Sequence, residues 1–364
     1  MKTALILTTI RVPTVLALYR RLDPSVRFFV AMDQKTPKAA YDFCASIPDC
    51  EVYSPDRQKE LGWECSSLLG WKTIARRNIA LLEALKWGAD VIVSIDDDNI
   101  PVDRYFDSFY DLWRASWQKE RWYLSSHGSY SDVVGAPFFS GLKVSGSGWF
   151  DPGYLQFPAD GMDPVCQRGF PQQLSSLRSF EPVVDARIGV AQGVVLGNPD
   201  TSAVDRISRH PTVHQVSEVL RAGVVSDPRQ VWAPLNAQNI AFLRELAPCF
   251  FMVPQFGRHD DIFAGLVAQR VMRERDLFVH YGRPFVWQQR NQHDLIKDLK
   301  AELWGMEHVV EFAVWLARDA FAADLSTLQT VKLIWKTERM LQRLPDGVAE
   351  LGEAWCRDCE RALA

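Results

Sequence analysis

Three consecutive aspartates, residues 96–98, follow an apolar run from position 91 to position 95. Adjacent carboxylates repel one another, and a pair about 4 Å apart costs about 4 kcal/mol at an effective dielectric near 20. A hard cation such as Mg²⁺ or Mn²⁺ prefers oxygen ligands and removes that repulsion while it bridges to a phosphate. In an extended chain Asp96 and Asp98 would lie on one side and Asp97 on the other. The triplet therefore predicts a site for a metal and the diphosphate or ribose of a nucleotide; the alternative is an acidic strand end with a capping turn.

A second acidic pair, Asp260 and Asp261, follows Arg258 and His259 and precedes apolar residues at helical spacing. This pattern predicts that the pair lies at the N-terminus of a helix. A helix cap is the alternative interpretation, because Asp is favoured there and complements the helix dipole. A cap needs one carboxylate, however. We therefore expect the pair to orient a sugar hydroxyl or to act as general base or nucleophile.

Basic side chains are available to neutralise a leaving diphosphate. The candidates are Arg11, Lys72, Arg76, Arg77, Arg168, Arg178 and Arg258. Any one of them is more often a solvated surface charge, and we expect at least one of Arg76 and Arg77 to face solvent. Arg168 lies in a loop rich in Gly and Pro, where packing gives little reason for an arginine. His280 and His293 could complete a metal shell, although a lone histidine is more often structural.

The elements that must position these residues alternate along the first hundred residues. Apolar runs predict strands over residues 3–10, 27–32 and 90–95, and a further short strand starting near residue 51. Helical spacing predicts helices over residues 14–22 and 71–87, the second stopped by Gly88. This rhythm predicts an α/β fold with a doubly wound, mainly parallel sheet and helices on both faces. Ligands bind beyond the carboxyl ends of such strands, where the loops at residues 8–13 and 96–101 lie.

The remainder of the chain divides into three stretches. Residues 125–180 are rich in Gly, Ser, Pro and Phe, and we interpret them as loops and hairpins that cover the site as a lid. Residues 187–197 and 231–242 read as strands that return to the sheet. From about residue 302 the pattern is mostly helical, so we predict a catalytic domain over residues 1–305 and a helical C-terminal extension over residues 306–364. A Gly-rich stretch at residues 140–150 lacks the spacing of an ATP or NAD loop.

The overall composition excludes several classes of protein. The 364 residues include 41 basic and 45 acidic side chains, for a net charge of −4, which argues against general binding of nucleic acid. Seven scattered cysteines do not suggest a secreted disulfide framework, and we interpret the pair Cys356 and Cys359 as two thiols on a helix face. The N-terminal apolar run is too short for a signal peptide, and no stretch approaches the roughly 20 apolar residues of a membrane helix. We expect a cytoplasmic protein without a membrane span.

The order of several short motifs resembles the reversibly glycosylated polypeptide family, which includes the plant UDP-arabinopyranose mutases. The motifs are TTIRVPTVL at 8–16, SIDDDNIP at 94–101, APFF at 136–139, RGFP at 168–171, GVAQGVVLGNPDTSAVD at 189–205, APLNAQNIAFLREL at 233–246, GRHDDIFAGL at 257–266 and GRPFVWQQRNQHDLIKDLKAE at 282–302. The resemblance runs from residue 3 to about residue 316. It implies a GT-A-like enzyme that acts on a UDP-sugar with Mn²⁺ or Mg²⁺.

The resemblance also implies roles for particular residues. The family becomes glycosylated on an arginine that matches Arg168, and a second family arginine matches Arg178. A Trp-His pair of the family is replaced here by Trp287 and Gln288, so His280 or His293 would have to supply the third metal ligand. We accordingly assign Arg168, Asp260 and Asp261 to catalysis, Thr9, Arg11, Asp96, Asp97 and Arg178 to nucleotide binding, and Asp96, Asp98 and His280 to the metal.

Three functions follow as hypotheses. The preferred one is a metal-dependent enzyme that interconverts the pyranose and furanose forms of a UDP-pentose, with self-glycosylation. The first alternative is a glycosyltransferase that passes the sugar to a separate glycan, lipid or natural product. The second is a non-catalytic, self-glycosylating subunit of a larger assembly. A nucleotide sugar is the expected partner, and assembly into a homo- or hetero-oligomer stays open.

Overall fold

The computed structural model describes residues 1–102, 104–118, 122–125, 142–145, 181–183, 186–208, 212–216, 221, 223–229, 235–290, 292–318, 324–341 and 344–364. The predicted lid at residues 125–180 therefore lies outside the described residues, except for Ser125 and one short strand. Within the described residues, thirteen strands form one sheet. They are β1 (Thr3–Thr9), β2 (Arg27–Met32), β3 (Cys50–Tyr53), β4 (Val91–Ile95), β5 (Asn99–Pro101), β6 (Trp122–Ser125), β7 (Leu142–Ser145), β8 (Glu181–Val183), β9 (Arg187–Gly197), β10 (Thr212–Val216), β11 (Val224–Ser226), β12 (Asn239–Leu243) and β13 (Leu277–Gln288).

The sheet is parallel in its N-terminal half and mixed beyond it. The strand order is β3-β2-β1-β4-β12-β9-β13-β11-β6-β8. The first four strands pair in parallel, whereas β12 is antiparallel to both of its neighbours. Strand β9 then pairs in parallel with β13. The carboxyl ends of β1, β2 and β4 therefore meet at one edge, as a ligand site in a doubly wound sheet requires.

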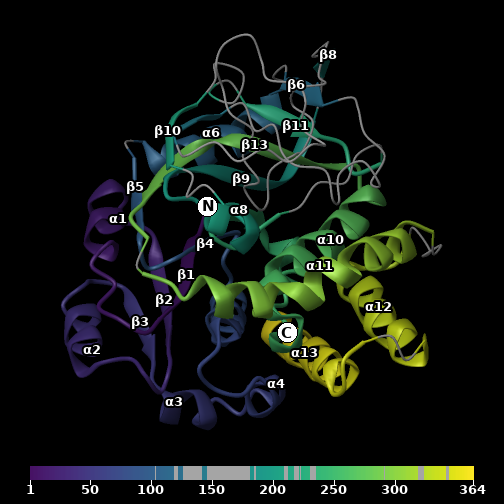
Figure 1. Ribbon diagram of the computed structural model, residues 1–364, viewed down its shortest axis with the longest axis horizontal. Coiled ribbons are helices and arrows are strands. Elements are labelled where there is room, and N and C mark those ends of the chain that lie inside the picture. Colours follow the sequence, from purple (N-terminus) through teal and green to yellow (C-terminus); the bar gives the residue numbers. More distant parts are fainter. Residues whose placement is uncertain are drawn as a thin grey trace.

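Helices cover both faces of the sheet. The α-helices are α1 (Leu16–Leu22), α2 (Lys38–Ala45), α3 (Pro55–Glu60), α4 (Glu64–Leu68), α5 (Arg77–Trp87), α6 (Tyr105–Gln118), α8 (Ala203–Ser208), α10 (Asp260–Arg273), α11 (Leu295–Arg318), α12 (Thr327–Leu341) and α13 (Val348–Leu363), and the 3₁₀ helices are η1 (Ile74–Arg76), η2 (Arg244–Cys249) and η3 (Pro254–His259). In Figure 1, α10 to α13 gather on one side of the molecule and α1 and α2 on the other. The predicted α/β fold with a helical C-terminal region is confirmed.

Strand β1 shows how the sequence builds two cores. All but one of its residues are buried, and successive side chains point to opposite faces. Ala4 and Ile6 join a core with α5, α10, α12 and α13, whereas Leu5 and Leu7 join a core with α1, α2 and α6. A strand that is buried on both faces reads as a continuous apolar run. This is why β1, β2 and β4 were predictable from sequence.

The segment before β4 differs from its prediction. A helix was expected from residue 71, but the helical part starts at Ile74 and the α-helix at Arg77. Gly70 and Lys72 have positive φ angles, which helices exclude. The Thr73 hydroxyl then accepts a hydrogen bond from the Ala75 N–H at 3.2 Å and caps the new helix. At the other end Gly88, with φ of 83°, closes α5 as predicted.

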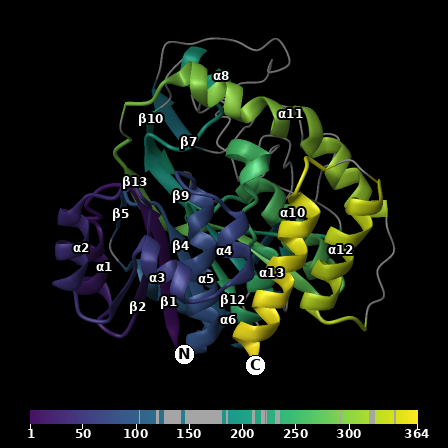
Figure 2. The same cartoon turned by 90° about the horizontal axis from the view of Figure 1, so that it is seen from below.

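The C-terminal helices are joined to the sheet through one continuous helix. The predicted boundary after residue 305 falls within α11. Helix α13 packs against α4 and α5, which lie beside it in Figure 2. Cys356 and Cys359 are buried free thiols in α13. The two halves of the chain therefore share one hydrophobic core.

A buried carboxylate connects α13 to the N-terminal half. Asp358 is fully buried, and its two oxygens accept hydrogen bonds from the Glu64 and Cys65 N–H groups at 2.9 and 2.8 Å. These are amide groups at the start of α4, which have no partner within their own helix. The neighbouring Arg357 makes an ion pair with Glu64 at 2.8 Å, but both of those side chains are about half exposed.

We predict that Asp358→Ala lowers the free energy of unfolding by about 2–3 kcal/mol, because it leaves two amides without an acceptor. The matched change Arg357→Ala, one residue away in the same helix, removes only an exposed ion pair and should cost less than about 1 kcal/mol. Urea unfolding monitored by circular dichroism measures both. Equal losses for the two variants would contradict the capping role of Asp358.

Candidate functional site at the carboxyl edge of the sheet

The acidic triplet lies in the tight turn that joins β4 to β5. Asn99 holds this turn: its side-chain oxygen accepts the Asp96 N–H at 3.1 Å, and its own N–H donates to the Asp96 carbonyl at 3.2 Å. The Tyr19 hydroxyl donates to the Asn99 carbonyl at 3.0 Å. Because the chain turns here, the alternation expected of an extended strand does not apply.

Each carboxylate of the triplet has its own partner. Asp96 accepts a hydrogen bond from Arg77 at 2.6 Å. Asp97 accepts one from the Thr9 hydroxyl at 2.5 Å and pairs with Arg11 at 2.9 Å. Asp98 lies 3.7 Å from the same Arg11 guanidinium. The structure thus brings together the predicted residues Thr9, Arg11, Asp96, Asp97 and Asp98.

The electrostatics of the triplet are those of crowded, partly buried acids. Burial raises the pKa of Asp97, although hydrogen bonding by Thr9 and the charge of Arg11 oppose the shift. Burial and then the charges of Asp96 and Asp97 raise the pKa of Asp98 to about 6, again against Arg11. The site is therefore unfavourable for the negative charge that it carries at neutral pH, and an added cation would relieve it.

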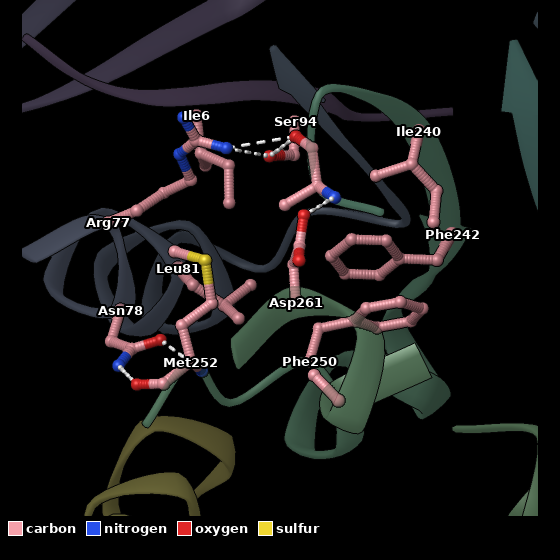
Figure 3. Close-up of a pocket in the computed structure, with 12 residues that line it drawn as sticks. Ile6, Arg77, Asn78, Leu81, Ser94, Ile240, Phe242, Phe250, Met252 and Asp261 are labelled. Carbon is pink, nitrogen blue, oxygen red and sulfur yellow. Dashed lines mark hydrogen bonds between the residues drawn. The ribbon is translucent and has the colours of Figure 1, made fainter. Parts of the chain in front are cut away.

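Figure 3 shows Arg77 in contact with Ser94, with the Asp261 side chain nearby. Arg77 connects the triplet to the second acidic pair. Besides Asp96, its guanidinium donates to the Ala237 carbonyl at 2.9 Å and to the Ser94 hydroxyl at 3.1 Å. The Ala237 N–H in turn donates to Asp261 at 3.0 Å. A cavity of about 20 Å³ lies among these groups, with room for one water molecule. Asp96 and Asp261, which lie far apart in sequence, are thus linked by one arginine and the backbone of one residue, Ala237.

The second acidic pair begins α10, as predicted. Asp260 is buried. Asp261 accepts the Ile262 N–H at 2.9 Å as well as the Ala237 N–H. Its carboxylate is therefore committed to backbone groups and anchors the turn before β12. The remaining chemical assignment of this pair, to sugar binding or proton transfer, stays a prediction.

The segment that leads into Asp260 is fixed against α11. A Cβ on Gly257 would lie 2.1 Å from the Ala301 carbonyl oxygen, and one on Gly305 would lie 2.4 Å from the His259 Cβ. Arg258 pairs with the fully buried Glu302 at 3.3 Å and with Asp200 at 3.1 Å. Arg258, one of the candidate phosphate ligands, is thus part of an ion-pair network that positions α10.

Two of the other basic residues, Arg76 and Arg77, differ from their predicted exposure. Arg76 and Arg77 are both buried, so the prediction that at least one faces solvent is wrong. The Arg76 guanidinium donates to Gln58 and Ser66 and lies 4.0 Å from the Trp71 ring. Arg76 therefore supports the loop before α5, while Arg77 faces the site. Lys72 is exposed.

His280 is not brought to the triplet, which corrects its assignment as a metal ligand. His280 lies in β13, opposite Ala191 of β9. Strand β12 lies between β9 and β4, and across it Ala191 is level with Val93 of β4. Three strand spacings of about 4.8 Å separate His280 from β4. Burial lowers its pKa to about 3, so it is a neutral core residue. The Nδ1 atom of His293 lies 3.1 Å from Asp298, in the ion-pair network of α11.

Two residues of this edge were given no site role from the sequence. Asp33, directly after β2, is buried and accepts the Lys72 N–H at 2.7 Å. Its position after a buried parallel strand was the available signal. Gln288, at the end of β13, donates from Nε2 to the Asp98 oxygens at 3.3 and 3.4 Å. It stands where the resemblance leads one to expect histidine. Arg168 and Arg178 lie outside the described residues.

The fold and this edge define the class of the protein. Carboxylates at the carboxyl ends of parallel strands, with helices on both faces, are typical of α/β proteins that bind nucleotides. The family model described as "Reversibly glycosylated polypeptide" matches residues 149–357. The chain belongs to the reversibly glycosylated polypeptide family. The matched range includes Asp260, Asp261 and Gln288, whereas the triplet precedes it.

Over the aligned half of their length, curated plant relatives are about a quarter identical to this chain. It is 27% identical to "Probable UDP-arabinopyranose mutase 4" and 25% identical to "UDP-arabinopyranose mutase 3", both of Arabidopsis thaliana, over 54% of this chain and 54% of each relative. "Probable UDP-arabinopyranose mutase 1" of Solanum tuberosum is 24% identical over 54% of this chain and 52% of its own. The chain spans about half the length of the curated relatives that it matches.

A solved structure gives a weaker likeness. Glucosyl-3-phosphoglycerate synthase from Mycobacterium tuberculosis, in complex with Mn²⁺ and UDP-glucose, aligns over 87% of this chain and 78% of its own, with a TM-score of 0.39 and 11% identity. That score is too low to support an inference about this chain. Among the described residues, no helix is long and apolar enough to cross a membrane.

We predict that Asp98→Asn stabilises the protein at neutral pH in the absence of metal. The native Asp98 carboxyl keeps its proton up to about pH 6, whereas in the unfolded chain it loses it near pH 4. The native state therefore binds more protons between these values, and stability falls as the pH rises through them. The variant lacks this loss. Its free energy of unfolding should therefore exceed that of the wild type by about 1–3 kcal/mol at pH 7 and equal it below pH 4.

Urea unfolding in EDTA at several pH values measures this difference. The exposed Asp42→Asn, which lies on α2 beside Lys38, is the matched control and should change stability little at any pH. If the difference in the free energy of unfolding between Asp98→Asn and the wild type does not vary with pH, the charge of Asp98 does not destabilise the native state.

Proposed function

We propose that this protein is a metal-dependent UDP-sugar enzyme that interconverts the pyranose and furanose forms of a UDP-pentose. The observation that carries the proposal is the acidic triplet, held between the carboxyl ends of β1 and β4 by Thr9, Arg11 and Arg77. Family membership and the names of the plant relatives support the choice of substrate. The proposal stands on this combination, because the family match alone does not include the triplet.

The charge balance of the edge supports a requirement for metal. Three carboxylates face two guanidinium groups, those of Arg11 and Arg77. One negative charge remains when all three acids are ionised, so a bare diphosphate would be repelled. A divalent cation reverses that balance and lets the diphosphate approach.

The donor set fits Mg²⁺ or Mn²⁺. The groups available are carboxylate oxygens of Asp96 and Asp98 and the side chain of Gln288, which suit a hard cation. Among the described residues, no three His, Cys, Asp or Glu side chains form a ready-made cage. A cation bound here would therefore have to take some of its ligands from the nucleotide and from water. A bound cation would stabilise the negative charge that develops on the departing diphosphate.

The residues of the chain supply binding and orientation. We assign Thr9 and Arg11 to the nucleotide, because they follow β1 at the edge where the triplet lies. Asp260, buried at the N-terminus of α10, is assigned to the sugar. In the proposed reaction the bond from the anomeric carbon to the diphosphate breaks, and the electron pair leaves with UDP. The sugar oxygen O4 then bonds to the anomeric carbon while the bond from that carbon to the ring oxygen O5 breaks, and the hydroxyl proton passes from O4 to O5. A diphosphate oxygen of the same UDP finally attacks the anomeric carbon of the furanosyl group.

We predict that the purified protein, given UDP-arabinopyranose and Mn²⁺ without any acceptor, forms UDP-arabinofuranose. Asp98→Asn should lower the rate at least about 100-fold, because the leaving diphosphate loses its charge stabilisation. Anion-exchange chromatography separates the two nucleotide sugars. The control Asp42→Asn should retain the full rate, since it changes one exposed carboxylate far from the triplet in sequence.

The alternative functions give different results in the same experiment. Consumption of UDP-sugar only after a glycan or lipid acceptor is added would show a glycosyltransferase instead. No consumption with any UDP-sugar, together with no UDP binding, would contradict the proposal as a whole.

Self-glycosylation is a further part of the proposal, and it rests on the sequence motif around Arg168 alone. Incubation with UDP-arabinopyranose is expected to add the mass of one pentose residue to the peptide that contains Arg168. Mass spectrometry of the digested protein detects this addition, and Arg168→Ala should abolish it. A pentose on another peptide in the wild type would reassign the modified residue.

A further inference from the structure

Gln288 is buried at the proposed cation site, and half of its amide group is unused. Its backbone pairs with Asn99 of β5 and Gly197 of β9, so the residue is fixed between two strands. The side chain is 2% exposed. Nε2 contacts both oxygens of Asp98, but Oε1 has no hydrogen-bond partner in the part of the chain that the structure describes. Buried polar atoms of this kind are rare and call for an explanation.

The spacing of this pair suits two ligands of one cation. The amide oxygen and nitrogen are interchanged by a half-turn of the amide group. The half-turn would place Oε1 where Nε2 lies, 3.3 to 3.4 Å from the Asp98 oxygens, and Nε2 where Oε1 lies, as a donor for a bound phosphate or water oxygen. Two oxygens that bind one cation at right angles, each at about 2.0–2.1 Å, lie roughly 3 Å apart. A small closing movement is therefore enough for both to bind.

The other acids of the triplet are engaged more tightly. Asp96 is bound by Arg77 at 2.6 Å and Asp97 by Thr9 at 2.5 Å. The contacts of Asp98 with Gln288 and Arg11 are all longer than 3.2 Å. Asp98 is thus the carboxylate that can change partner at least cost, and Gln288 is the side chain already beside it.

We propose that Gln288 is an oxygen ligand, together with Asp98, of the divalent cation that the proposed function requires. The Asp96 oxygen that Arg77 does not contact, together with nucleotide and water oxygens, completes the shell, so the cation binds tightly only when UDP is present. This inference rests on the proposed function and replaces the histidine ligand expected from the family motif. An all-oxygen shell favours Mg²⁺ and Mn²⁺, whereas an imidazole in that position favours softer cations such as Co²⁺ and Zn²⁺.

Electron paramagnetic resonance of the full chain with Mn²⁺ and UDP tests the ligand directly. Electron spin-echo modulation detects a nitrogen that is bound to Mn²⁺. The wild type should show no directly bound nitrogen, and Gln288→His should acquire one. Directly bound nitrogen in the wild type would show that a histidine is the ligand, and its absence in Gln288→His would show that this position does not reach the metal. Either result would overturn the proposal.

Affinity provides the second readout, from the free Mn²⁺ signal during titration. Gln288→Leu should weaken Mn²⁺ binding in the presence of UDP at least about tenfold. The matched control is Gln269→Leu, which replaces another fully buried glutamine in the interior of α10 and should stay within about twofold of the wild type. A Gln288→Leu affinity equal to that of the control would also overturn the assignment.

These measurements separate this inference from the proposed function. If the wild type binds Mn²⁺ and UDP but Gln288→Leu and Gln288→His behave like the wild type, only the role of Gln288 fails. If the wild type shows no Mn²⁺ binding with UDP, the metal requirement fails and the assignment of Gln288 fails with it. If both Gln288 variants give the expected results but the wild type forms no furanose product, Gln288 is supported as a ligand and the mutase reaction is rejected.

Discussion

The repulsion among three adjacent carboxylates is the constraint on which this edge of the sheet depends. A turn with the sequence of residues 96–98 is unstable unless other parts of the chain bring counter-charges and donors to it. The structure brings them from separate elements: Arg77 from α5, Arg11 and Thr9 from the end of β1, and Gln288 from the end of β13. The folded sheet therefore assembles this edge, and no local segment could do so alone.

The constraint is only partly satisfied in the protein alone. Asp98 has longer contacts than Asp96 and Asp97 have with their partners, and burial makes its charge costly. A fully compensated triplet would hold its acids in fixed pairs and leave nothing for a ligand to stabilise. Functional sites commonly keep such incomplete compensation, at a cost in stability.

The parts that could be predicted from sequence are those whose physics is local. The strands β1, β2 and β4 are continuous apolar runs, and the acids that follow β4 and begin α10 could be located by position alone. Burial of Arg76 and Arg77 could not, because it depends on Gln58, Ser66 and Asp96 being brought to them. The longest strand, β13, was missed because Gly282 and Pro284 interrupt its pattern, where the register against β9 shifts.

Asp358 reaches the amides of α4 across 293 and 294 positions of chain. During synthesis on the ribosome, the N-terminal half of the sheet is complete long before this acceptor emerges. Contacts between such distant residues form late and slowly. A nascent chain that ends before α13 keeps the apolar surfaces of α5 uncovered, although these belong to the same core as β1. Exposed apolar surface of this kind favours aggregation and recognition by chaperones, so the completed core depends on translation at least through α13.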